Sequence, residues 1–139
     1  MPMTIDATQL AGKKQISVLV LAGELDASNY ERLIDAVRRE YEAGSRGLVI
    51  DLAGLTFMAS SGLVALYAAE RIFRGEAAPD LEAGWQVIHD LEAETSAAAN
   101  IRLAAVQPAV ERVLQRTGMS RLFPMDLTAE VAADQLRSE

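Results

Sequence analysis

The chain has 139 residues, half of them hydrophobic, and a formal net charge of −7. This length suits one domain with a hydrophobic core, and the acidic charge argues against nucleic acid and anionic membranes, which bind Lys- and Arg-rich patches. There is no cysteine, which excludes disulfides and cysteine-based catalysis or metal binding. No leader pattern and no apolar run near the ~18 residues of a membrane span is present, so we expect a cytoplasmic protein.

Two strands are predicted near the start of the chain. Residues 15–21, QISVLVL, are apolar and β-branched and predict a buried strand. Residues 3–9, MTIDATQ, alternate more weakly and predict an edge strand beside it, joined through a turn at Gly12. The GELD sequence after the second strand is predicted as a loop that carries two acids, Glu24 and Asp26.

A helix follows this loop. Apolar residues recur at helical spacing between Tyr30 and Tyr41. Ser28 and Glu31 have the spacing of a capping box at its start, and Gly44 has the place of a glycine just beyond its end.

The middle of the chain predicts a second strand–helix unit. Residues 47–52, GLVIDL, form a continuous apolar run that is typical of a central parallel strand. The sequence AGLTFM is predicted to connect this strand to a helix that runs from about Ser60 to Arg74. Residues 75–99 then change character, because they contain six acids and neither Lys nor Arg. We interpret them as an acidic, partly helical insertion.

The last third of the chain continues the alternation of strands and helices. IRLAAV at 101–106 predicts a strand, and QPAVERVLQRTG at 107–118 predicts a helix that Gly118 ends. LFPMDL at 122–127 predicts a short extended piece before a final helix at 128–137. Such alternation implies a mostly parallel sheet, in which functional residues gather where strands run into helix N-termini. The GELDAS and FMASSG loops have that position.

Three motifs in this order resemble the STAS domain family, in particular its anti-sigma factor antagonists. They are LAGELDASNYERL, LVIDLAGLTFMASSGLVALYAAERI and IRLAAVQPAVERVLQRTGMSRLF. The resemblance covers most of the chain apart from the insertion, so we expect one STAS domain over residues 1–139. It implies an α/β fold with a four- to five-stranded mixed, mostly parallel sheet and about four helices, largely on one side.

The resemblance also implies a function in protein–protein binding. Members of this type bind an anti-sigma factor that is also a serine kinase, which phosphorylates the first serine of a D-S-S-G motif and so abolishes binding; a phosphatase reverses the modification. That serine corresponds to Ser60. The partner-binding residues implied are Glu24, Asp26, Ala59, Ser60, Ser61 and Gly62. We expect no cofactor, metal or membrane insertion, and a monomer or weak homodimer.

The sequence departs from the family at two places. Ala59 stands where the family carries an acid before the serines, and the segment at 75–99 is longer than the usual link. The alanine leaves the acceptor hydroxyl of Ser60 in place but removes a charge beside it. The longer segment either adds a partner surface or covers one.

Residue chemistry leaves Ser60 with two interpretations. Its hydroxyl is suited to cap backbone N–H groups at a helix start. A phosphate at the same place would add about −1.5 to −2 charges beside those N–H groups and the positive end of the helix dipole. Gly62 has two interpretations as well, close approach of a partner and simple packing at the helix start.

Catalysis is the weakest interpretation of the sequence. The single histidine, His89, lies in the insertion rather than near Ser60, and ASSG is not a G-x-S-x-G nucleophile elbow. There is no glycine-rich phosphate loop. The alternative to a phosphorylation switch is therefore a STAS scaffold or ligand-binding subunit of a transporter or sensor complex, in which Ser60 only caps the helix.

Overall fold

The computed structural model describes residues 3–76 and 100–138. Its strands are β1 (Thr4–Leu10), β2 (Ile16–Leu25), β3 (Gly47–Met58), β4 (Ile101–Ala104) and β5 (Met125–Asp126). Its helices within these ranges are α1 (Tyr30–Glu42), α2 (Ser60–Phe73), α4 (Pro108–Thr117), α5 (Met119–Leu122) and α6 (Ala129–Arg137).

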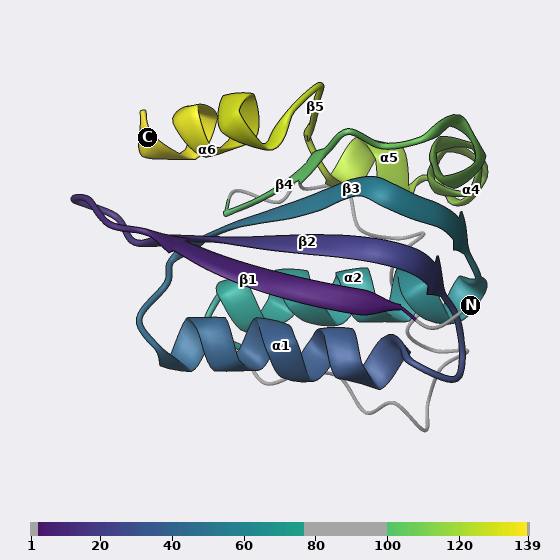
Figure 1. The fold of residues 1–139 in the computed structure, drawn as a ribbon, viewed down its shortest axis with the longest axis horizontal. Coiled ribbons are helices and arrows are strands. Elements are labelled where there is room, and N and C mark those ends of the chain that lie inside the picture. The colour runs from purple at the N-terminus through teal and green to yellow at the C-terminus, as the bar shows by residue number, and fades with distance from the viewer. Residues whose placement is uncertain (1–2, 77–99, 139) are drawn as a thin grey trace.

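The five strands form one mixed sheet in the order β1-β2-β3-β4-β5 (Figure 1). Only β1 and β2 pair in an antiparallel manner, and each later pair is parallel. The predicted mixed and mostly parallel sheet is confirmed, with β1 at its edge and β3 at its centre. The parallel arrangement aligns the carboxyl ends of β2 and β3, which positions the loops considered below.

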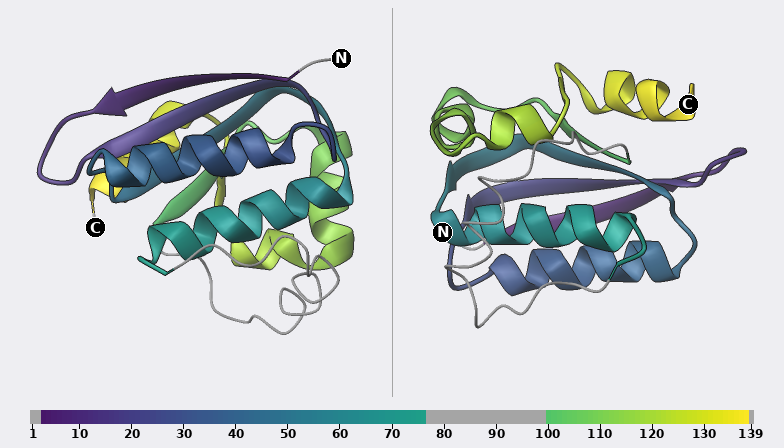
Figure 2. Two further views of the ribbon diagram at one scale, coloured as in Figure 1. Left: turned by 90° about the horizontal axis from the view of Figure 1, so that it is seen from below. Right: turned by 180° about the vertical axis from the view of Figure 1, so that it is seen from behind.

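Helices cover both faces of the sheet unequally. In Figure 2, α1 and α2 lie side by side against one face, and α6 lies on the opposite face. Buried residues of α1, α2, α4 and α5 join one large core cluster. A smaller cluster unites α6 with the other face through residues such as Val18, Val49, Ala133 and Leu136. The expectation of helices largely on one side is thus confirmed.

Strands β2 and β3 are longer than the sequence suggested. Gly23 to Leu25 belong to β2, and the AGLTFM sequence belongs to β3, so the predictions of a GELD loop and a separate connection were wrong. The pairing of the two strands is irregular here, because its register shifts between Val20 and Ala22 and again between Gly23 and Glu24. At this irregularity a Cβ on Gly54 would lie 2.9 Å from the Ala22 Cβ. Glycine therefore permits the pairing to continue, although it reads as a turn residue in sequence.

The ends of α1 were only partly predicted. Gly44 follows the helix as expected, with φ of 107°. The capping box of Ser28 and Glu31 was wrong, because Asn29 is the N-cap and no side chain caps the helix. Ser28 instead donates to the Asp26 carboxylate. The Asp26 carboxylate thus takes the Ser28 hydroxyl that the capping box would have used.

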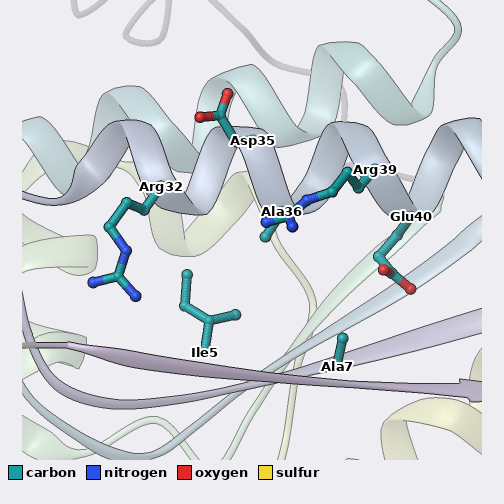
Figure 3. Close-up of a pocket in the computed structure, with 7 residues that line it drawn as sticks. All are labelled: Ile5, Ala7, Arg32, Asp35, Ala36, Arg39 and Glu40. Atoms are coloured by element: carbon teal, nitrogen blue, oxygen red, sulfur yellow. The ribbon is translucent and has the colours of Figure 1, made fainter.

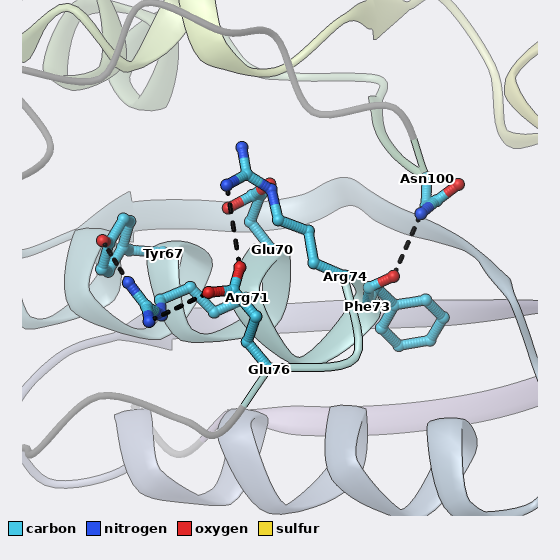
Figure 4. A network of polar contacts seen from close by, with 7 residues as sticks. All are labelled: Tyr67, Glu70, Arg71, Phe73, Arg74, Glu76 and Asn100. Atoms are coloured by element: carbon cyan, nitrogen blue, oxygen red, sulfur yellow. Dashed lines mark hydrogen bonds and ion pairs between the residues drawn. The ribbon is translucent and has the colours of Figure 1, made fainter.

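A polar network holds the carboxyl-terminal end of α2 (Figure 4). Arg71 donates to the Tyr67 hydroxyl at 3.0 Å and pairs with Glu76 at 3.2 Å. Arg74 pairs with Glu76 at 3.7 Å and with Glu70, whose side chain is only 3% exposed. Asn100, at the start of the next described segment, donates its side-chain N–H to the Phe73 carbonyl at 3.0 Å.

The predicted insertion lies almost entirely outside the described residues, as does His89 within it. Among the helices of the described ranges, none has the length and hydropathy needed to cross a membrane.

Candidate functional site

The carboxyl ends of β2 and β3 bring the two loops singled out in the sequence to one edge of the sheet. Leu25 pairs with Met58 in the parallel register, and the Ala59 N–H donates to the Leu25 carbonyl at 2.9 Å. Asp26 and Ser60 each follow within two residues of these strand ends. The loops are therefore tied together by the sheet itself, and we call this surface the strand-end site.

The β2–α1 loop is organised by side-chain hydrogen bonds. The Asp26 carboxylate accepts from the backbone N–H of Ser28 at 2.9 Å and from its hydroxyl at 2.5 Å. These bonds favour the charged form, and the Ser28 hydroxyl in particular lowers the pKa of Asp26 below its ordinary value. Asp26 consequently presents a fixed negative charge at the strand-end site.

Asn29 also stabilises the β2–α1 loop, and the sequence analysis did not identify it. Its side chain is 6% exposed. It accepts from the Asp26 N–H at 2.9 Å and donates to the Glu24 carbonyl at 2.8 Å. An asparagine just before a helical pattern is the signal that could have identified it, because Asn is a common N-cap and turn residue.

The last residues of the two strands add a charged and an apolar side chain. Glu24 lies in β2 and is partly buried, and it is paired in register with Phe57 of β3. The Phe57 side chain is 48% exposed. Phe57 has no role in the sequence analysis, because the sequence did not show that β3 extends to Met58 and leaves this side chain exposed.

Ser60 is the first residue of α2 and is exposed. The N-cap is Ala59, with extended backbone angles, and no side chain caps this helix. The interpretation of Ser60 as a cap is therefore wrong, since its hydroxyl has no hydrogen bond to any described residue. The first turn of α2 contains no acid. No carboxylate of that turn therefore balances the positive end of the helix dipole or accepts from the first N–H groups.

Ser61 and Gly62 differ from Ser60 in facing the protein. The Ser61 Oγ is buried and has no hydrogen-bond partner among the described residues. Gly62 is buried, and a Cβ there would lie 2.6 Å from the Met58 Cγ and 3.0 Å from the Leu25 Cδ2. Glycine is thus needed for α2 to pack on the strand ends, which favours the packing interpretation of Gly62 over direct contact with a partner.

The chemistry available at the strand-end site is that of recognition. It combines an exposed hydroxyl at a helix N-terminus, a fixed carboxylate and an exposed aromatic ring. Across residues 3–76 and 100–138, His, Asp and Glu side chains form no group of three or more that could hold a metal ion. The part of the chain that the structure describes contains no imidazole, because the single histidine, His89, lies outside it.

Solved structures of anti-sigma factor antagonists share this fold. The unphosphorylated form of SpoIIAA is 20% identical, with a TM-score of 0.70 over 98% of each chain. An antagonist from Mycobacterium paratuberculosis is 22% identical, with a TM-score of 0.62 over 96% of this chain and 95% of that one. The phosphorylated form of Bacillus SpoIIAA is 21% identical, with a TM-score of 0.59 over 95% of this chain and all of that one.

The sequence itself carries the family signal. A comparison of the chain with curated proteins found no match. The model of the family described as "Mlab, STAS domain" matches residues 8–79, which is more than half of the 139 residues and includes both loops of the strand-end site. The arrangement of strands, the position of these loops and this match lead to one conclusion: the chain belongs to the STAS domain family.

Proposed function

We propose that this protein is an anti-sigma factor antagonist-like regulator without enzymatic activity. It binds an anti-sigma factor that is also a serine kinase, and phosphorylation of Ser60 ends the binding. The observation that carries this proposal is the exposed Ser60 hydroxyl, which begins α2 beside the end of β2 and has no structural hydrogen bond among the described residues.

The helix N-terminus suits Ser60 as a phosphate acceptor. Free N–H groups and the positive dipole end favour an anion at this position. The first turn of α2 contains no acid that would already fill this role. A phosphate at Ser60 is therefore compatible with the folded domain, so the modification would alter the surface and leave the fold intact.

The same phosphate would change the binding surface sharply. Asp26 already presents a carboxylate there, and Phe57 presents a half-exposed ring that suits the apolar centre of an interface. About two added negative charges would oppose any partner surface that accommodates Phe57 closely. In this proposal Glu24, Asp26, Ala59 and Ser60 face the partner, while Ser61 and Gly62 support them from beneath.

The structural relatives support this mechanism by analogy. SpoIIAA, an anti-sigma factor antagonist of the same fold, has been solved in a phosphorylated and an unphosphorylated form. We expect the corresponding phosphatase to restore binding in the present protein. We also expect a cytoplasmic protein that is a monomer or weak homodimer when free.

A second candidate function is that of a scaffold or ligand-binding STAS subunit in a transporter or sensor complex. Ala59 favours it, because the acid that precedes the serines in the antagonists is missing. The family model, described as "Mlab, STAS domain", is also named differently from the antagonist structures. In this function the strand-end site still binds a protein, but Ser60 is never modified.

Affinity purification from the source cell separates the two functions. The tagged wild-type protein is expected to recover a small serine kinase. Incubation of the two proteins with ATP should then place one phosphate on Ser60, which mass spectrometry of the peptides would locate. Phe57→Ala should lose the partner, since an aromatic ring at the centre of an interface often contributes more than about 2 kcal/mol.

Leu127→Ala is the matched control, because Leu127 is a large apolar side chain that is 89% exposed elsewhere on the molecule. It should recover the partner like the wild type. Recovery of a transporter ATPase without phosphate on Ser60 would favour the scaffold function. Recovery of the same partner by Phe57→Ala would show that the strand-end site is not the binding surface.

A further inference from the structure

A groove runs between the edge strand β1 and helix α1, away from the strand-end site (Figure 3). Its volume is about 290 Å³. Ile5 and Ala7 of β1 and Ala36 of α1 give it an apolar floor, and four charged side chains of α1 surround that floor: Arg32, Asp35, Arg39 and Glu40. This volume is just below the ~300–1,000 Å³ range of ligand pockets, which suits a compact ligand.

The two acids of the groove are occupied by other groups. Asp35 pairs with Arg38, with 3.1 Å between the Arg38 Nη1 and the Asp35 Oδ1. Glu40 accepts from the Ser17 hydroxyl at 2.6 Å and from the Gln9 side-chain amide at 3.3 Å. In Figure 3 the Asp35 carboxylate points away from β1. Both carboxylates are therefore held by other groups, and neither forms an ion pair with Arg32 or Arg39.

The two arginines keep uncommitted donors. Arg32 reaches from α1 toward β1 and uses one N–H group, on Nη1, to bind the Met3 carbonyl at 2.9 Å. In Figure 3, Arg39 extends along the helix toward Ala36. Its guanidinium makes no hydrogen bond or ion pair with any described residue. Seven positions separate the two arginines, which is two helical turns, so both lie on the side of α1 that borders the groove.

We propose that this groove binds a compact phosphomonoester. The guanidinium groups of Arg32 and Arg39 donate to the phosphate oxygens, a geometry that the planar fork of arginine matches. The apolar part of the ligand rests on Ile5, Ala7 and Ala36. The ligand is a free small molecule, because the volume of the groove, about 290 Å³, suits a compact molecule. The site is separate from Ser60 and independent of the proposed switch.

Phenyl phosphate is a suitable probe, since it joins a phosphate to a small apolar group. Isothermal titration calorimetry with the full chain should detect binding, and the backbone amide signals of Ile5 and Ala7 should shift in NMR spectra. Arg39→Gln should weaken binding about tenfold, the effect of losing a charged hydrogen bond. Ala7→Phe should abolish it by filling the groove.

Arg112→Gln is the matched control, because Arg112 is an exposed arginine of α4 that does not line the groove. It should bind phenyl phosphate within twofold of the wild type. Inorganic phosphate and phenol should each bind more weakly than the ester. The proposal is overturned if the wild type does not bind, or if Arg112→Gln weakens binding as much as Arg39→Gln. Binding only to vesicles that contain phosphatidic acid would likewise overturn it, in favour of a membrane surface.

Discussion

The two ends of helix α2 use their polar side chains in opposite ways. At the carboxyl-terminal end, Arg71 and Arg74 are engaged by Tyr67, Glu70 and Glu76. The Arg71 Nε alone is a buried arginine atom there without a hydrogen-bond partner among the described residues. At the amino-terminal end, Ser60 is exposed without a described partner, and the buried Oγ of Ser61 also lacks one.

This contrast separates a structural end of the helix from the end to which the proposed function assigns partner binding. Side chains that bind one another fix the helix and contribute to stability, because a buried polar group without a partner is costly. At the other end the fold relies on glycine packing instead, and the hydroxyl of Ser60 remains available to a partner protein. Changes at the two ends should therefore have different consequences for stability and binding.

Gly62→Ala is expected to have the largest effect on stability. The added Cβ would lie 2.6 Å from the Met58 Cγ, so α2 would have to move from the strand ends, at a cost of about 3 kcal/mol in the free energy of unfolding. Urea denaturation followed by circular dichroism measures this. Gly12→Ala should change stability by less than about 0.5 kcal/mol, because its Cβ would come no nearer than 3.9 Å to the Lys14 carbonyl oxygen.

Arg74→Gln tests the structural end of the helix. It removes the pair between the Arg74 Nε and Glu70, whose side chain is 3% exposed. We expect a loss of about 1–2 kcal/mol, reduced because the arginine itself is partly exposed. Arg38→Gln breaks the Arg38–Asp35 pair, whose side chains are 46% and 64% exposed, and should cost less than about 0.5 kcal/mol. Equal effects of the two substitutions would contradict this assignment.

Ser61→Ala should stabilise the protein by up to about 1 kcal/mol, because it removes a buried hydroxyl without a partner and introduces a better helix former. Ser60→Ala makes the same chemical change at an exposed neighbouring position. The difference between their thermal denaturation midpoints isolates the buried hydroxyl. A destabilised Ser61→Ala protein would mean that the Ser61 hydroxyl does have a partner in solution.

Asp26→Asn should have the smallest effect on stability, and that effect should depend on pH. The Ser28 hydrogen bonds lower the pKa of Asp26 in the folded state. The charged carboxylate therefore stabilises the fold above about pH 4, its unfolded range, and this contribution is lost as the pH falls through the lower folded pKa. Denaturation midpoints of both proteins at several pH values measure it. A difference between them that grows on acidification would have the wrong sign.

Sequence reasoning predicted the fold better than the details of the site. Apolar runs and glycines located the strands and most helices, because burial dictates their periodicity. It missed the continuation of β2 and β3 through Gly23 and Gly54, since glycine indicates a turn unless the close approach of a second strand is known. It missed α5, because a helix of four residues is too short to show a helical pattern of apolar residues.

The site illustrates the same limit. The sequence placed Asp26 and Ser60 at two strand ends, and a parallel sheet then required them to lie together. It could not tell that Ala59 takes the N-cap position or that Asn29 organises the neighbouring loop. Those roles depend on which of several adjacent polar residues reaches a particular backbone group, and that is decided by tertiary geometry.

The affinity of Ser60→Glu for the partner recovered by purification tests the central claim most directly. A carboxylate at the start of α2 should leave stability unchanged or raise it slightly, yet binding measured by calorimetry should weaken at least about tenfold. Lys13→Glu, in the turn between β1 and β2 at the other end of the sheet, changes the net charge at least as much and should bind normally. Wild-type affinity of Ser60→Glu would contradict the proposed switch.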